Sequence, residues 1–206
     1  MDENERIQPR DTPYMSNEAL ASDPGGVTID PQRLRQLSPS LFGLGALLPT
    51  RAIARKILAA HMWNGDSRAA VALSVQPLLV AAYSSDFDAV VVLRFDRRPV
   101  DSYVQVGSRL LTVNTYFRGT PARDILRGSV VSPVWANFYP VIADFVAADP
   151  ARVERRKAAI SEPEWQRTWD LGQDYLVKSP ASSGTGRRTA RTVRRPDHEP
   201  TSCTES

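Results

Sequence analysis

Four consecutive aliphatic residues constrain the fold of this chain more than any other feature. They form the centre of the segment DAVVVLRF, at 88–95: Val90, Val91, Val92 and Leu93. An unbroken run of aliphatic residues, three of them β-branched, is typical of a strand with both faces covered, because a strand with one solvated face alternates apolar and polar residues. The segment is therefore predicted to be a central strand of a sheet that carries other structure on both sides.

Two further segments rich in β-type residues follow, at 102–106 and 109–117. Gly107 and Ser108 separate them, and a two-residue loop with glycine first suits a type II′ hairpin turn. These two segments are therefore predicted to pair with each other. The earlier segment 68–75 is also predicted to be a strand.

The stretch 77–84 allows two interpretations. Pro77 would open a short helix after a cap at Gln76, or it would merely break an edge strand. The helix, which would complete a β-α-β unit between 68–75 and 88–95, is the interpretation preferred here.

Capping residues and apolar spacing predict several helices. The first begins near Pro49, ends near Gly65 and has an apolar side that includes Ile57 and His61. Asn137 is a cap residue for a second helix with Pro140 in its first turn. The apolar residues of this helix follow the i, i+3, i+4, i+7 spacing: Phe138, Val141, Ile142 and Phe145.

Two more helices are predicted after this one. Asp149 before Pro150 opens the first of them, and the capping box SEPE at 161–164 opens the second. One face of the last helix carries these residues: Trp165, Trp169, Gly172 and Leu176. Packing in a core is the favoured interpretation of this aromatic face, and stacking on nucleic-acid bases is the alternative.

Strands in the middle and helices in the last third indicate an α+β fold. We expect a central, mostly antiparallel or mixed sheet with an N-terminal helix and C-terminal helices. A chain of 206 residues, 42% of them hydrophobic, has room for one domain, which is predicted at 31–177. The acidic segment 1–30 and the arginine-rich segment 178–206 have few apolar residues and are predicted to be disordered tails.

The rare residues exclude several classes of site. Cys203 is the single cysteine, so an intrachain disulfide is impossible and a reducing compartment such as the cytoplasm is expected. With His61 and His198 as the only histidines, neither a metal site nor another cofactor is expected.

Neither a secretory signal nor a membrane contact is expected. The N-terminal sequence MDENERIQPR lacks the basic start and apolar stretch of a signal peptide. The longest uncharged run has 17 residues, between Arg68 and Asp86, whereas a spanning helix needs roughly 20 apolar residues.

A few polar residues of the predicted domain are candidates for chemistry. His61 is the only one that titrates near neutral pH and could serve as a general base, although its place on an apolar helix side favours a packed core histidine. Asp86 and Asp88 could hold a cation if their segment were extended, although a solvated turn is favoured. With Arg94 and Tyr83, these residues would make an enzyme site only if the fold assembled it.

The C-terminal tail is the candidate for nucleic-acid contact. Its basic residues cluster within nine positions: Arg187, Arg188, Arg191, Arg194 and Arg195. Such a segment would bind phosphates weakly and without regard to base sequence, and a solubilising tail is the favoured interpretation.

The chain has no dense set of titratable groups in its predicted domain. We therefore expect a non-enzymatic protein-binding or interaction module, whose partner is another protein. The alternatives are a small hydrolase or transferase with a fold-assembled polar site, and weak nucleic-acid binding through the tail.

Overall fold

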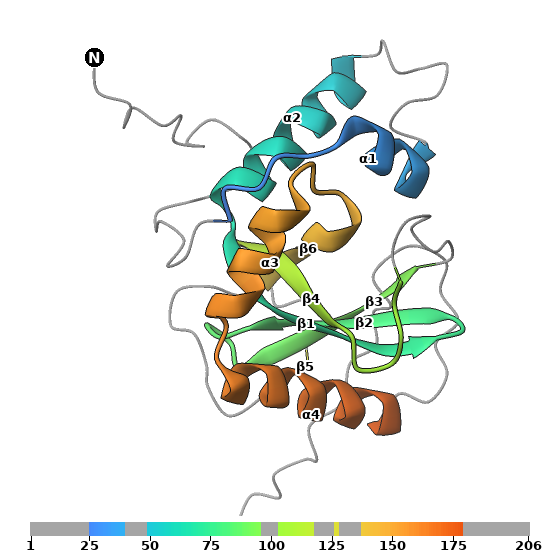
Figure 1. Ribbon diagram of the computed structural model, residues 1–206, viewed down its shortest axis with the longest axis vertical. Helices are drawn as coiled ribbons and strands as arrows, with labels where there is room; N and C mark the ends of the chain where they lie inside the picture. Colours follow the sequence, from blue (N-terminus) through green and yellow to red (C-terminus); the bar gives the residue numbers. More distant parts are fainter. Residues whose placement is uncertain (1–24, 40–48, 96–102, 118–125, 128–136, 179–206) are drawn as a thin grey trace, which may run out of the picture.

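The computed structural model describes residues 25–39, 49–95, 103–117, 126–127 and 137–178 (Figure 1). Its helices are α1 (Pro31–Leu37), α2 (Pro49–Asn64), the short 3-10 helix η2 (Ala143–Phe145), α3 (Pro150–Ala159) and α4 (Glu162–Lys178). Its strands are β1 (Asp66–Val75), β2 (Leu78–Ser84), β3 (Ala89–Phe95), β4 (Arg109–Phe117), β5 (Leu126–Arg127) and β6 (Asn137–Ile142).

The strands form one antiparallel sheet in the order β5-β3-β2-β1-β4-β6. Helices from both ends of the described chain pack around it, which confirms the predicted α+β fold. The aliphatic run lies in β3, where Val90, Val91 and Val92 are all buried. β3 is not at the centre of the sheet, however, because among the described strands the short β5 alone lies beyond it.

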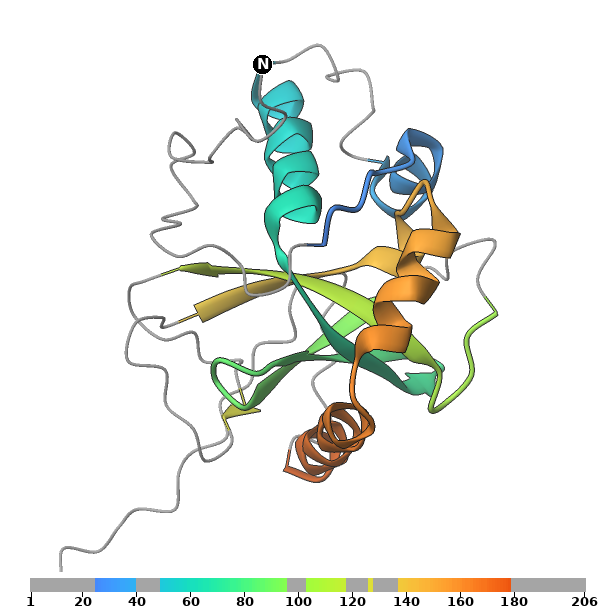
Figure 2. The ribbon, with the colours of Figure 1, turned by 60° about the vertical axis from the view of Figure 1, so that its left-hand side comes forward.

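The sheet is strongly bent. β2 contacts β6, although β1 and β4 lie between them in the hydrogen-bonding order. Inside the bend, Phe87 of the β2–β3 turn stacks on Phe138 of β6, with ring centroids 5.8 Å apart. Figure 2 shows the bend from the side, with α2 standing above the sheet and α4 seen nearly end-on below it. The sheet therefore has an inner face and an outer face.

Strand register assigns side chains to these two faces, because successive residues of a strand point to opposite sides. Arg68, opposite Thr112, points to the inner face, and Ala69, opposite Leu111, points to the outer face. α4 covers the outer face of β1, β2 and β3, and the end of α2 covers that of β4.

Gly172 allows α4 to lie close to the sheet. A Cβ atom at this position would come 2.7 Å from a methyl carbon of Leu73 and 3.0 Å from the Cβ atom of Ala81. Trp165 and Tyr175 are buried on the same side of the helix, while Trp169 is only half-buried. The core interpretation of the aromatic face therefore agrees with the structure.

Three local predictions are wrong. Residues 77–84 contain no helix: β2 follows the turn at Gln76 and Pro77, and it pairs antiparallel with β1 and β3. Val80 and Ala82 are buried on its inner face and Ala81 is buried on its outer face. A strand covered on both sides buries more of this apolar stretch than a short surface helix would.

The predicted hairpin across Gly107 is also wrong. Residues 103–108 form no strand, and β4 pairs with β1 and β6 instead. Gly107, at φ 85°, lies in a turn in which the Ser108 N–H donates to the carbonyl of Gln105. β1 offers β4 a long, buried partner strand, which the five residues of 102–106 could not match.

The predicted helix at Asn137 is an edge strand, β6, followed by η2. Phe138, Pro140 and Ile142 are buried at every second position, while Tyr139 is exposed. The apolar residues thus fit a two-residue period as well as a helical one, and an edge strand tolerates Pro140.

α2 begins at Pro49, near which a helix start was predicted, and α3 and α4 begin at the predicted caps. The Asp149 carboxylate accepts a hydrogen bond from the Arg152 N–H at 3.0 Å, as a cap should. Residues 25–30, on the N-terminal side of the predicted domain boundary, pack against the body, and Val27 is buried there. Residues 25–30 are therefore part of the described fold, together with the residues from 31 onward.

Candidate polar site inside the bent sheet

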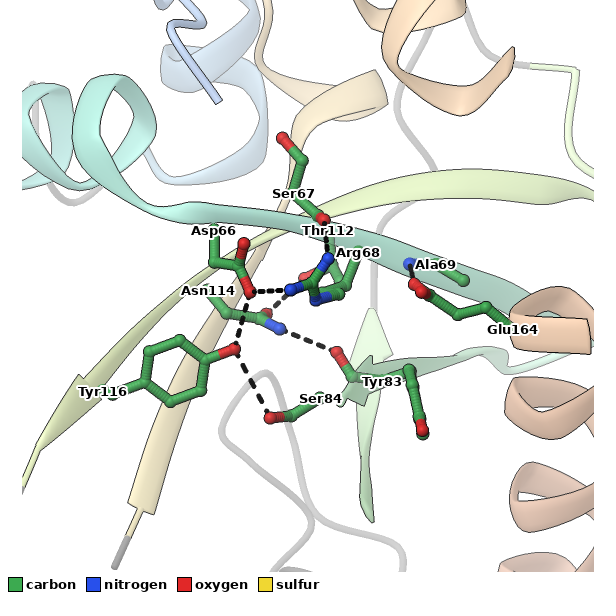
Figure 3. A network of polar contacts seen from close by, with 10 residues as sticks. All are labelled: Asp66, Ser67, Arg68, Ala69, Tyr83, Ser84, Thr112, Asn114, Tyr116 and Glu164. Carbon is green, nitrogen blue, oxygen red and sulfur yellow. Dashed lines mark hydrogen bonds and ion pairs between the residues drawn. The ribbon is translucent and has the colours of Figure 1, made fainter. Parts of the chain in front are cut away.

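The inner face of the sheet holds a buried polar network (Figure 3). Asp66 of β1 is its centre and is 1% exposed. The side chains that surround it come from three strands: Arg68 of β1, Ser84 of β2, and Thr112, Asn114 and Tyr116 of β4. We call these six residues the inner polar network.

Two donors meet at one carboxylate oxygen of Asp66. The Tyr116 hydroxyl donates to Oδ2 at 3.0 Å, and Arg68 Nη2 lies 2.9 Å from the same oxygen. Burial, and next the charge of Asp66, raise the pKa of Tyr116 far above its ordinary value. The phenol therefore stays protonated and remains a hydrogen-bond donor to the carboxylate.

The rest of the network joins the two sides of the bend. Asn114 Nδ2 donates to the backbone carbonyl of Tyr83 at 2.7 Å, and its Oδ1 accepts from the Thr112 hydroxyl at 2.9 Å. The Ser84 hydroxyl donates to the Tyr116 oxygen at 3.4 Å. Because β1 lies between β4 and β2, these bonds cross the bend and help to maintain it.

His61 lies elsewhere: it belongs to α2, its ring faces β4 on the outer face of the sheet, and it is 4% exposed. Its Nε2–H donates to the carbonyl of Val113 at 2.7 Å, and its Nδ1 accepts from the Thr115 hydroxyl at 3.0 Å. Burial lowers the pKa of His61 to about 4, against the opposing effect of the Val113 hydrogen bond. The ring is therefore neutral at pH 7, with both nitrogens engaged.

Asp88 and Tyr83 are hydrogen-bonded to each other, and Asp88 also binds Arg167 of α4. Asp88 has a φ of 44° in the turn between β2 and β3. Its Oδ1 accepts from the Tyr83 hydroxyl at 3.1 Å and from Arg167 Nε of α4 at 2.8 Å. This bidentate contact with Arg167, completed by Nη2 and Oδ2 at 2.5 Å, joins the turn to α4.

The other two sequence candidates lie apart from this contact. Asp86 is half-buried in the same turn, where its charge acts on Arg68 and Tyr116. Arg94 is five residues beyond the start of β3 at Ala89, toward the far end of that strand. Among the described residues, no cluster of three or more His, Cys, Asp or Glu side chains is placed to hold a metal ion.

Sequence reasoning missed the inner polar network, although a signal for it exists. Thr112, Asn114 and Tyr116 occupy every second position of a predicted strand, which places them on one face. Asp66 and Arg68 show the same spacing at the start of β1. A polar face was visible in each strand, but only the fold shows that the two faces meet.

The remaining candidates lie outside the described residues. These are the five tail arginines proposed for nucleic-acid contact: Arg187, Arg188, Arg191, Arg194 and Arg195. Within the described ranges, none of the helices is both long and apolar enough to cross a bilayer. Comparison with protein-family models, with curated proteins and with solved structures finds no match.

Proposed function

We propose that this chain is a non-enzymatic binding module that contacts another protein through the turn 103–108. The observation that carries the proposal is the presentation of Tyr103, which is 90% exposed and lies two residues before residues 105–108, a turn held in place by hydrogen bonds. Val106, on the same turn, is also exposed. Exposed aromatic side chains on a rigid support are favoured anchors in protein interfaces.

The turn is held by four hydrogen bonds. Gly107 N–H donates to the carbonyl of Ala72 at 2.8 Å, and Ala72 N–H donates to the carbonyl of Ser108 at 3.1 Å. Within the turn, Ser108 N–H donates to the carbonyl of Gln105 at 3.0 Å, and Gln105 N–H donates to the Ser108 hydroxyl at 3.0 Å. A pre-ordered turn loses little conformational entropy when a partner binds.

The polar groups support a non-enzymatic role. Asp66, His61 and Asp88 each make a hydrogen bond or ion pair with a partner inside the fold. A general base needs a lone pair within reach of substrate, and both ring nitrogens of His61 are already used inside the fold. The internal contacts therefore favour structural roles for these side chains over acid-base catalysis.

A photo-crosslinking residue at position 103 tests the proposal. We expect it to capture one protein from a lysate of the source cells, whereas the same residue at Val177, an exposed aliphatic position of α4, captures none. With that protein purified, we expect Tyr103→Ser to weaken binding about tenfold or more, as the loss of an interface aromatic does. Val177→Ser should leave binding unchanged.

Two results would overturn the proposal. One is binding of the purified protein that Tyr103→Ser and Val106→Ser leave intact. The other is turnover of an ester, phosphoester or glycoside substrate by the full chain that Asp66→Asn or His61→Gln abolishes without loss of folding. The second result would return the inner polar network or His61 to a catalytic role.

A further inference from the structure

α2 combines a positive charge with a partly exposed apolar side. Its sixteen residues include three Arg or Lys residues and no acid. Ile53 is 53% exposed, Trp63 is 41% exposed, and Lys56 is exposed between them. At 100° per residue these three side chains lie on one side of the helix, together with Ala60. We call this side, from Ile53 to Trp63, the exposed α2 face.

A further positive charge lies at the C-terminal end of this face. The guanidinium carbon of Arg152, in α3, is 5.8 Å from the centroid of the Trp63 ring. Cation and ring attract each other at this distance. An acidic segment that contacts Trp63 would therefore meet Arg152 as well as Lys56.

The described chain begins beside the same end of α2. Three successive backbone N–H groups donate to carbonyls at the end of the helix: Gly25 to Gly65 at 2.7 Å, Gly26 to Trp63 at 2.8 Å and Val27 to Met62 at 3.1 Å. These contacts satisfy carbonyls that a helix end leaves without partners. They also fix the point from which residues 1–24 extend.

Residues 1–24 complement the exposed α2 face in charge and length. They contain six acids and two arginines, a net charge of −4, and also the apolar residues Tyr14, Met15 and Leu20. A helix of sixteen residues is about 24 Å long, a span that roughly eight extended residues cover. Twenty-four residues starting at Trp63 can therefore follow the whole face.

We propose that the acidic segment 1–24 docks on the exposed α2 face of its own chain. Carboxylates of the segment pair with Lys56 and Arg152, and its apolar residues cover Ile53 and Trp63. The inference is independent of the turn 103–108, because the two surfaces share no residue.

Carbodiimide cross-linking of the full chain tests this docking, since it joins only amines and carboxylates in contact. We expect Lys56 to be joined to Glu18 or an earlier acid of the segment. Lys178, an exposed lysine of α4, is the matched control and should be joined to none of these acids. Ile53→Ser should lower the Lys56 yield about fivefold, the factor for one lost aliphatic contact, whereas Val177→Ser should not.

The alternative occupants give different products. A mixture of isotope-labelled and unlabelled chains distinguishes cross-links within one chain from those between two copies. Lys56 products between copies, equal yields at Lys56 and Lys178, or no product with residues 2–18 would each overturn the proposal. Loss of Tyr103-dependent capture would not affect it, so the two proposals fail separately.

Discussion

Two helices cover the outer face of the same sheet and are held in different ways. α4 buries Trp165, Leu171 and Tyr175, and Gly172 brings it close to the strands. Of the α2 side chains from residue 52 onward, only His61 and Met62 are buried. Apolar packing thus holds α4 along its length, whereas the two buried side chains among residues 52–64 of α2 lie near its C-terminal end and Ile53 stays exposed.

The largest effect should come from α4. Trp165→Ala removes a buried ring, and we expect it to lower the free energy of unfolding by about 3–5 kcal/mol. Ile53→Ala on α2 is the contrasting change and should cost less than about 1 kcal/mol, because half of this side chain is already in water. Urea denaturation measures both, and equal costs would refute the contrast between the helices.

The next largest loss of stability should come from replacement of Asp66. Asp66→Asn leaves the Arg68 guanidinium, which is 16% exposed, without its carboxylate, and we expect a loss of about 3 kcal/mol. Asp88→Asn breaks a similar contact with Arg167, which is 41% exposed, and should cost about 1 kcal/mol. Chemical denaturation measures the free energy of unfolding of both variants. A larger loss for Asp88→Asn than for Asp66→Asn would contradict these roles.

Acidic pH should lower the free energy of unfolding through His61 of α2. An unfolded histidine takes up a proton near pH 6.5, while the folded-state pKa of His61 is about 4. The unfolded state therefore binds more protons in this interval, and stability falls as the pH falls from 6.5 to 4, by about 3 kcal/mol in total. The measurement is the free energy of unfolding against pH for the natural chain and for His61→Gln, in which the histidine part of this slope should disappear.

Removal of residues 25–30 should also lower the stability of the fold, because these residues contact the C-terminal end of α2. Val27 is 1% exposed, and its segment provides three backbone hydrogen bonds to the helix end. We expect a chain starting at residue 31 to be about 2 kcal/mol less stable than one starting at Gly25. Thermal melts of the two truncated chains compare them directly, and identical midpoints would show that these contacts add nothing.

The smallest effect on stability should come from the turn 103–108. Tyr103→Ser alters an exposed side chain and should change the free energy of unfolding by less than about 0.5 kcal/mol. A larger loss, measured by the same denaturation, would mean that the ring serves the fold and is not available to a partner.

Local sequence signals were sufficient for the helices that begin with caps. Asp149 before Pro150 and the SEPE segment mark α3 and α4 because capping depends on neighbouring residues alone. β2 and β6 were missed for the opposite reason. Their apolar residues fit a helix and a strand alike, and the choice depends on partner strands far away in the sequence.

In the candidate site, too, local features could be predicted from the sequence and long-range contacts could not. The packed position of His61 follows from the helix that carries it, and it was the favoured interpretation. The inner polar network depends on the bend that brings β4 against β2, so the partners of Asp66 and Asn114 could not be assigned from spacing. Asp88 was considered with Asp86, but the turn directs it to Arg167 instead.

NMR titration of the His61 ring tests most directly whether the buried titratable groups are structural. The sequence has one other histidine, His198, so the His61 signals are assigned with a His61→Gln variant. A structural role of His61 predicts a pKa of about 4 and the signals of one neutral tautomer, protonated at Nε2, at pH 7. A pKa near 6.5, with exchange between tautomers, would contradict it and make His61 available as a general base.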